Sequence, residues 1–266
     1  MDLEERPGRE VNDLTLGETA RSKWLGLFAQ PKPVLAMLHL GGDDAAGKLE
    51  RAQTEASTLI DGGVDAVIVE NYFGDKDDVR RALEALSNRT GSAVLGLNVL
   101  HDHELAFELA AEFPVGFVQI DSVAGHLEPA ADAEYAARLA ELRAASAALV
   151  FGGVRFKYQP VNSGRSEAED LALGAARSDA IVVTGEGTGM VTDLEKIERF
   201  RRTLPAEFPL VVGAGVTAEN VDAQLRDADG VIVGSYLKHD YRDTGIVDAE
   251  HVAEFMRAVG DVRKSL

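Results

Sequence analysis

Three side chains suited to proton transfer or imine chemistry follow apolar runs in separate parts of the chain. Glu70 lies at the end of DAVIVEN, Asp121 closes VGFVQID, and Lys157 comes near the end of ALVFGGVRFKY. Two carboxyl groups can serve as general acid and base, or bind a divalent cation through oxygen. A lysine in this setting suits Schiff-base formation, proton transfer or binding of an anionic oxygen. His39, near the end of VLAMLHL, is a further candidate for proton transfer near neutral pH or for donation to a substrate oxygen.

A second group of residues is suited to binding an anion. The run PLVVGAG ends on Gly213 and Gly215, and the run DGVIVGS ends on Gly234 and Ser235. Glycine lets backbone N–H groups approach a ligand closely, a hydroxyl adds a donor, and a helix N-terminus beyond the glycines adds partial positive charge. The alternative is that these glycines only permit tight turns after each run.

The loop TGEGTGMVTD, residues 184–193, is also rich in glycine and hydroxyl groups. Its glycines predict either a mobile lid with hinges or a second contact to an anion. It is not a P-loop, because no GK[ST] follows and an acidic residue stands where a triphosphate would need a base.

The elements that must position these residues alternate regularly along the chain. Eight apolar runs cover 34–40, 65–71, 93–99, 115–121, 148–158, 179–185, 209–215 and 229–235. Helix-like segments follow them at 46–61, 75–88, 102–112, 132–146, 167–177, 192–203, 217–226 and 246–260. Apolar strands rich in Val and Ile, separated by helices, predict a parallel sheet covered on both faces.

Eight such units favour one closed (β/α)8 TIM barrel over an open doubly wound sheet, and no GxGxxG follows the first run to support the open sheet. We therefore predict an N-terminal extension over residues 1–32 and a barrel domain over residues 33–262. Within the extension, Trp24 and Phe28 predict a short helix packed against one end of the barrel.

A barrel brings the carboxyl ends of its strands together at one rim, where the chemistry of this fold occurs. That rim would gather Glu70, Asp121, Lys157 and His39 as catalytic residues. Asn71, Asn98 and Thr184 would bind substrate, and Gly213, Gly215, Gly234 and Ser235 would bind phosphate, since the loops after strands seven and eight are the recurrent phosphate site of these barrels. Any one of these side chains could instead cap a turn, so their convergence is what favours a site.

Composition excludes several classes of function. The chain has 45 acidic and 27 basic residues, a net charge of −18, and no cysteine. This charge disfavours nucleic acid and anionic membranes as partners, and the lack of cysteine excludes thiolate metal sites. No apolar run approaches the roughly 20 residues of a membrane helix, so we expect a cytoplasmic protein without membrane insertion. The acidic surface also suits a salt-rich cytoplasm, where self-repulsion is screened.

We expect no required cofactor. Two carboxylates and nearby Asn side chains are too few for a tightly held structural metal, which leaves Mg²⁺ only as an ion that bridges to substrate. Whether the protein forms a homo-oligomer stays an open question, because no interface pattern is visible in the sequence.

Seven segments together resemble the BtpA/SgcQ family, over residues 32–260 and in the right order. They are KPVLAMLHL, GGVDAVIVENYFGD, GLNVL, VRFKY, DAIVVTGEGTG, VVGAGVTAENV and DGVIVGSYLK. The resemblance implies a phosphate-binding (β/α)8 barrel and carries over His39, Glu70, Asn71, Asn98, Lys157, Thr184, Gly213, Gly215, Gly234, Ser235 and Lys238.

This chain departs from the family pattern at the barrel mouth. It reads DSVAG where many relatives read NVHTG, so Asp121 replaces an Asn and Val123 replaces a His. Tyr158 also stands where a His is more usual. These changes leave the identity of the substrate open.

The residues and the resemblance together favour an enzyme that acts on a small phosphorylated sugar or nucleoside-like compound, as an isomerase, epimerase or aldolase-type lyase. The family name comes from a photosystem I biogenesis factor, which keeps open a non-enzymatic assembly or scaffold role. A regulator that binds a sugar phosphate without turnover is a third hypothesis.

Overall fold

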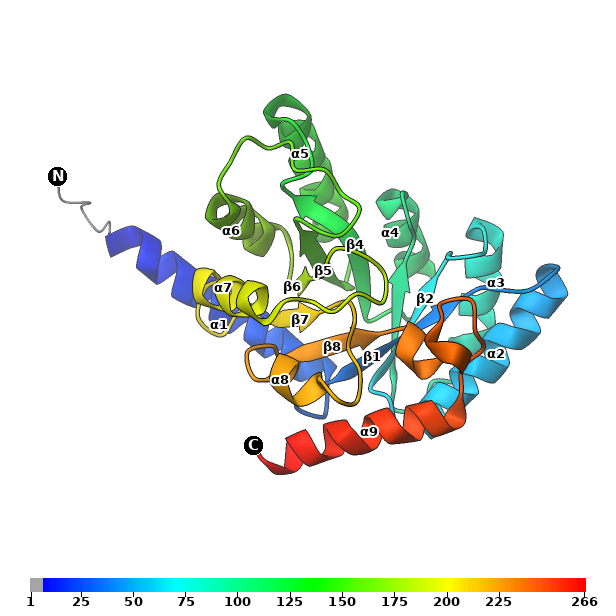
Figure 1. The fold of residues 1–266 in the computed structure, drawn as a ribbon. Coiled ribbons are helices and arrows are strands. Elements are labelled where there is room, and N and C mark those ends of the chain that lie inside the picture. The colour runs from blue at the N-terminus through cyan, green and yellow to red at the C-terminus, as the bar shows by residue number, and fades with distance from the viewer. Residues whose placement is uncertain (1–6) are drawn as a thin grey trace.

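Eight parallel strands close into a barrel in chain order, as predicted, and the last strand pairs with the first. The computed structural model describes residues 7–266, with side chains from residue 15 onward. The strands are β1 (Val34–His39), β2 (Ala66–Glu70), β3 (Val94–Asn98), β4 (Phe117–Ala124), β5 (Leu149–Val154), β6 (Ala180–Val183), β7 (Leu210–Val212) and β8 (Gly230–Val233). Figure 1 shows them around one centre, with helices outside.

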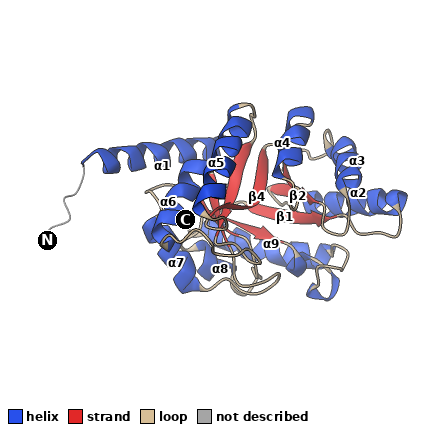
Figure 2. Ribbon diagram, turned by 90° about the horizontal axis from the view of Figure 1, so that it is seen from above, coloured by secondary structure: helices blue, strands red, loops and turns tan. Residues whose placement is uncertain are grey.

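The helices follow the strands in alternation and surround the sheet (Figure 2). They are α1 (Pro7–Leu27), α2 (Ala45–Asp61), α3 (Lys76–Leu86), α4 (His103–Glu112), α5 (Pro129–Ala144), α6 (Glu167–Arg177), α7 (Leu194–Thr203), α8 (Val221–Leu225) and α9 (Ala249–Lys264). Two 3₁₀ turns, η1 (Ser235–Leu237) and η2 (His239–Tyr241), stand between β8 and α9. Local sequence fixes several helix starts: the side chains of Asp75 and Ser166 form capping boxes for α3 and α6.

The sheet register aligns three candidate site residues. His39 pairs with Glu70, and Glu70 pairs with Asn98, so the last residues of β1, β2 and β3 form one row across the barrel. Because each residue ends its own strand, the row lies at the carboxyl rim.

The N-terminal extension plugs the opposite end of the barrel. Trp24 and Phe28 belong to the interior cluster that includes Phe117 and Phe151. The Trp24 ring centroid lies 5.5 Å from that of Phe151, which stacks on Phe117 at 4.2 Å. The predicted helix is therefore present, and it is longer than expected: α1 begins at Pro7 and projects beyond the barrel in Figure 1. Residues 1–6 of the predicted extension lie outside the described residues.

The fifth strand is shorter than its apolar run indicated. The sequence predicted a strand over 148–158, whereas β5 ends at Val154. The backbone of Arg155 and Tyr158 takes the left-handed conformation, with φ of 46° and 61°, which ends the strand. Lys157 is consequently held on a turn between these two residues.

The helix after β7 also differs from the prediction. A helix was expected over 217–226, but α8 spans only Val221–Leu225. The Asn220 side chain accepts from the Thr217 backbone N–H and donates to the Gly215 carbonyl, so it shapes a turn here. The glycines after β7 therefore precede a turn and a short helix, with the Val221 backbone N–H bonded to the Thr217 carbonyl at 3.0 Å, and the contribution of a helix N-terminus to anion binding here stays a prediction.

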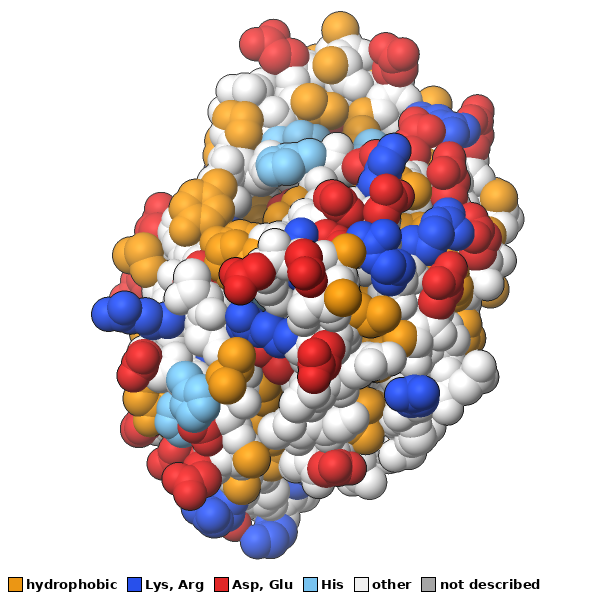
Figure 3. Space-filling model, turned by 90° about the vertical axis from the view of Figure 1, so that its right-hand side faces the viewer, with side chains coloured by type: hydrophobic (Ala, Val, Ile, Leu, Met, Phe, Trp, Pro, Cys, Tyr) orange, Lys and Arg blue, Asp and Glu red, His pale blue; other side chains and the backbone are white. Residues whose placement is uncertain are grey.

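Acidic and basic side chains are interspersed on the surface (Figure 3), with ion pairs such as Arg138 with Glu104 and Arg199 with Glu167. Among residues 7–266, the helices are all too short or too polar to cross a membrane.

The net charge of −18 predicts that salt stabilises the fold. Raising KCl from about 0.1 M to about 1 M shortens the Debye length from about 10 Å to about 3 Å, which screens self-repulsion. We expect the melting temperature to rise by at least about 3 °C, equivalent to about 1 kcal/mol. Thermal unfolding followed by circular dichroism in a KCl series measures this, with sucrose as a control for excluded-solute effects. Equal melting temperatures in low and high salt would contradict the prediction.

Candidate active site

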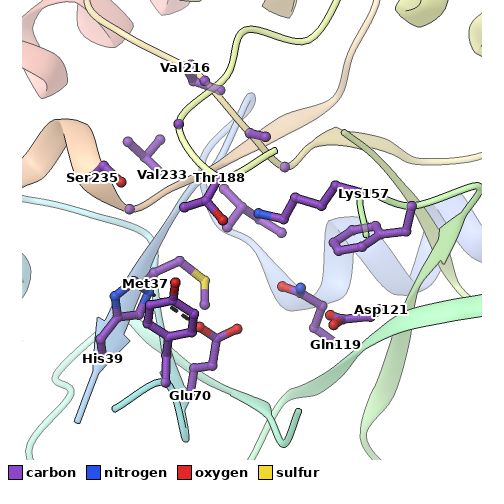
Figure 4. A pocket seen from close by; sticks show the side chains of 18 of the residues that line it. Met37, His39, Glu70, Gln119, Asp121, Lys157, Thr188, Val216, Val233 and Ser235 are labelled. Atoms are coloured by element: carbon purple, nitrogen blue, oxygen red, sulfur yellow. Dashed lines mark ion pairs between the residues drawn. The ribbon is translucent and has the colours of Figure 1, made fainter. Parts of the chain in front are cut away.

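A cavity of about 350 Å³ opens at the carboxyl ends of the strands. One side of it carries titratable and polar side chains from β1, β2, β4 and the loop after β5, among them His39, Glu70, Gln119, Asp121 and Lys157. The other side is formed by the loops after β6, β7 and β8 and is lined by Thr188, Gly189, Gly213, Gly215, Gly234 and Ser235. Figure 4 shows the two sides facing each other.

The carboxyl groups of Glu70 and Asp121 are bridged by one amide. Asn98 Nδ2 donates to Glu70 Oε1 at 2.9 Å and to Asp121 Oδ1 at 3.2 Å. Burial, and after it the neighbouring charge of Asp121, raise the pKa of Glu70 from 4.5 to about 8. Burial also raises the pKa of Asp121. Glu70 can therefore hold or release a proton close to neutral pH, which suits a general acid or base.

His39 contacts Glu70 on one side and a buried lysine on the other. Its Nε2 lies 3.4 Å from Glu70 Oε2, and its Nδ1 lies 2.8 Å from Lys238 Nζ. Burial lowers the pKa of His39 to about 3, with a further contribution from the charge of Lys238. His39 is thus a neutral imidazole at physiological pH. Of the two roles expected for His39, proton transfer and donation to a substrate oxygen, this favours the second.

Lys157 reaches into the cavity from its turn (Figure 4). Its backbone N–H donates to Thr184 Oγ1 at 2.9 Å, which anchors the turn to the end of β6. Its Nζ lies 5.8 Å from the centre of the Phe156 ring. A primary amine held over the same cavity as Glu70 and Asp121 can stabilise an oxygen anion or form an imine with a carbonyl.

The glycines opposite differ in what requires them. A Cβ on Gly215 would stand 2.3 Å from the Met190 backbone, and the φ of Gly215 is 65°, so packing and conformation both demand glycine there. A Cβ on Gly213 would meet a Val182 methyl at 2.6 Å. At Gly234 the nearest atom would be Met37 Cβ at 3.5 Å, an ordinary contact. The small size of Gly234 is therefore not imposed by packing, and its backbone lies open to the cavity.

The loop over residues 184–193 lies against this glycine side. Thr192 Oγ1 donates to the Ala214 carbonyl at 3.0 Å, and the Thr188 backbone N–H donates to the Tyr158 hydroxyl at 2.8 Å. These two contacts tie the loop to the residues after β7 and after β5. Its mobility as a lid stays a prediction.

The sequence profile of the BtpA family matches residues 30–261, which is most of the chain. The chain belongs to the BtpA family.

Relatives of this BtpA-family chain match it almost end to end. A protein of Archaeoglobus fulgidus is 32% identical, with 85% of this chain and 98% of the relative covered. The photosystem I biogenesis protein BtpA of Synechocystis is 25% identical, with 90% and 91% covered. The sgc region protein SgcQ of Escherichia coli is 26% identical, with 91% and 99% covered. The resemblance to the BtpA/SgcQ family inferred from the sequence is confirmed.

Solved structures support the fold. The tryptophan synthase alpha chain of Legionella pneumophila superposes with a TM-score of 0.62 at 15% identity, and the match covers 92% of the BtpA-family chain and 97% of that chain. This likeness shows the TIM-barrel fold alone.

Three residues predicted to bind substrate lie behind the cavity surface of the BtpA-family barrel. Asn71 Oδ1 accepts from the Leu100 backbone N–H at 2.7 Å. Asn98 is buried and orients the two carboxyl groups. Thr184 is buried beneath the Lys157 turn. We therefore correct their role from substrate contact to support of the residues that line the cavity.

Other lining residues were missed or misjudged from the sequence. Gln119 stands two residues before Asp121 on the same strand and lines the cavity with it, a period-two signal that was available. His101 was not among the candidate residues, but it lies at the cavity in a left-handed conformation with φ of 66°. Tyr72 lines the cavity and donates its hydroxyl to Asp243 Oδ2 at 3.0 Å.

Proposed function

We propose that this BtpA-family barrel is an enzyme that moves a proton on a small phosphorylated sugar or nucleoside-like compound, as an isomerase, epimerase or aldolase-type lyase. One observation carries the proposal. The buried Glu70 carboxyl, with its pKa raised to about 8, faces the same 350 Å³ cavity as the amine of Lys157. Cavities of about 300–1,000 Å³ are typical of small-molecule sites.

The geometry supports a simple scheme. In its ionised form, Glu70 takes a proton from a substrate carbon next to a carbonyl, and the C–H electron pair forms the double bond of an enolate. Lys157 stabilises the enolate oxygen as a cation. Alternatively, its amine first condenses with the carbonyl, water leaves, and the resulting protonated imine accepts the C–H electron pair to give an enamine in place of the enolate. Return of the proton from Glu70 to the same or a neighbouring carbon completes an epimerisation or isomerisation. Asn98 keeps the Glu70 carboxyl facing the cavity through the bond to Oε1.

The phosphate of the substrate would lie on the opposite side. Gly234 leaves its backbone open, Ser235 offers a hydroxyl, and the 184–193 loop closes the same corner with Thr188 and Gly189. The names of barrels with similar structures, such as tryptophan synthase alpha chain, support an enzyme of this fold without indicating the substrate.

Gly234→Ala tests the phosphate side. The added methyl fits without strain but projects where the ligand would approach the backbone, so we expect affinity for phosphorylated ligands to fall about tenfold, or about 1.4 kcal/mol. Thermal-shift assays against sugar phosphates and the corresponding free sugars measure this. A ligand at 100 times its Kd stabilises the fold by about 2.7 kcal/mol.

Gly260→Ala in α9 is the matched control, since a Cβ there meets nothing within 4 Å and lies far from the cavity residues. It should keep the affinity of the wild type. A wild-type protein that no phosphorylated compound stabilises would overturn the phosphate assignment.

This scheme requires no metal. Among the side chains that the structure describes, residues 15–266, no three or more His, Asp or Glu groups are arranged to hold a metal ion. Mg²⁺ would take part only by bridging substrate oxygens to Asp121, and turnover that disappears in EDTA and returns with Mg²⁺ would assign it that role.

An assembly factor is the second candidate, favoured by the name of the Synechocystis relative, a photosystem I biogenesis protein. It predicts that folded variants of Glu70 keep their biological effect. Loss of that effect on replacing one buried carboxyl would favour catalysis.

A further inference from the structure

Lys238 is a buried lysine that does not reach the cavity. It follows η1 and its side chain has no exposed surface. Its Nζ lies 2.8 Å from His39 Nδ1 and donates to the Asp243 carbonyl at 3.1 Å. An antiparallel bridge to Val247 and a hydrogen bond of 3.0 Å that the Lys238 carbonyl accepts from His251 Nδ1 hold the Lys238 backbone in place.

The charges around Lys238 are balanced. Burial lowers its pKa to about 8, while the charges of Glu55 and Asp243 favour its charged form. Arg51 opposes them, but it is ion-paired with Glu55 at 2.7 Å. Lys238 is therefore a cation at pH 7.

The chemistry of the two side chains fixes where the proton of His39 lies. An ammonium group can only donate, so Nδ1 of His39 must accept from Lys238. The proton of the neutral ring is then on Nε2, which faces Glu70 Oε2 at 3.4 Å. The other tautomer would place an Nδ1–H against the ammonium at 2.8 Å, where neither group can accept, and would leave it only the more distant Asp243 carbonyl, 3.4 Å away, as an acceptor.

We propose that Lys238 is a positioning residue that holds His39 in the Nε2–H tautomer. His39 then presents a donor to Glu70 Oε2, while Asn98 donates to Glu70 Oε1, so the carboxyl is held from both oxygens. The same Nε2–H is available to a carbonyl or enolate oxygen of a bound substrate. The catalytic value of this arrangement rests on the proposed function, whereas the tautomer is a property of the free protein.

Long-range ¹H–¹⁵N correlation NMR of the ligand-free protein at pH 7.0 tests the proposal. The chain has six histidines, and the signals lost in His39→Gln assign those of His39. In the wild type we expect a pyrrole-type Nε2 signal and a pyridine-type Nδ1 signal. In Lys238→Met we expect the reverse assignment, a pyrrole-type Nδ1 signal and a pyridine-type Nε2 signal. Nδ1 has then lost its donor and can carry a proton that points toward the Asp243 carbonyl.

Two further variants separate this role from general packing. Lys238→Gln carries an N–H donor without the charge and should restore the wild-type pattern in part or in full. Lys48→Met removes another lysine with an ion pair, 2.7 Å from Asp78, and should leave the His39 signals unchanged.

A protonated Nδ1 in the wild type overturns the proposal even where Lys238→Met does not fold. An unchanged tautomer in a folded Lys238→Met protein also overturns it. Failure of the proposed enzymatic function would leave the wild-type spectrum as expected here, so the two failures are distinguishable.

Discussion

Glu70→Gln is expected to gain stability relative to the wild type as the pH rises from about 5 to above 8. Burial raises the pKa of Glu70 from 4.5 to about 8, so the folded wild type keeps a proton that the unfolded chain has already released. Folding then becomes less favourable by about 1.4 kcal/mol per pH unit across this window, or up to about 5 kcal/mol in total. A glutamine has no such proton and escapes the cost.

Urea unfolding of both proteins at pH 5 and at pH 8.5 measures the change. At a single pH, the difference in unfolding free energy between the two proteins also includes the effect of the new amide, which faces the donors of Asn98 and His39. The diagnostic quantity is therefore the change in this difference between pH 5 and pH 8.5. Glu104→Gln is a control with no expected change. The bond to Arg138 lowers the pKa of Glu104 below its ordinary 4.5, so Glu104 is ionised in the folded and unfolded states across this window, and the stability difference from the wild type should stay nearly constant. A pH-independent difference between wild type and Glu70→Gln would show that Glu70 is ionised in the folded protein.

Lys157→Met is expected to lower turnover by about 10²–10³-fold, as removal of one group that stabilises a developing oxygen anion does in other enzymes. The fold should tolerate the change, because Lys157 is half-buried on a turn. Within the described residues, its hydrogen bond to Thr184 is donated by the backbone N–H and does not involve the side chain. Steady-state kinetics with a phosphorylated substrate measures the loss. Lys264→Met, on the exposed end of α9, should retain full activity.

Borohydride distinguishes the two roles open to Lys157. Trapping of a substrate adduct on Lys157, seen by mass spectrometry, would assign imine chemistry and an aldolase-type reaction. Loss of turnover without a trapped adduct would assign stabilisation of an enolate, as in an isomerase or epimerase. A fully active Lys157→Met protein would contradict both roles.

The barrel and one row of its site were predictable because they depend on strand order. His39, Glu70 and Asn98 each end a strand, and parallel pairing in register brings such residues together whatever the details of packing. Gln119 was predictable in principle from its spacing to Asp121, and Asn71 could have been excluded, since it follows Glu70 and successive side chains in a strand point to opposite faces.

Other features depend on contacts that no local pattern reveals. Lys157 was placed on a strand because its run is apolar, and the left-handed turns at Arg155 and Tyr158 carry no sequence signal as strong as glycine. Lys238 stands 199 residues from His39 and is buried behind it. The family resemblance marked the position, but its partner is visible only in the folded protein.

Deuterium exchange provides the most direct measurement of the proposed chemistry. Small phosphorylated sugars and nucleoside-like compounds are incubated with the protein in D₂O, and the C–H signals next to each carbonyl are followed by ¹H NMR. We expect at least one compound to exchange, at a rate about 10²–10⁴-fold lower with Glu70→Gln, the range lost with a general acid–base group. Equal exchange rates with wild type and Glu70→Gln, or no exchange in any phosphorylated compound, would contradict proton transfer by Glu70.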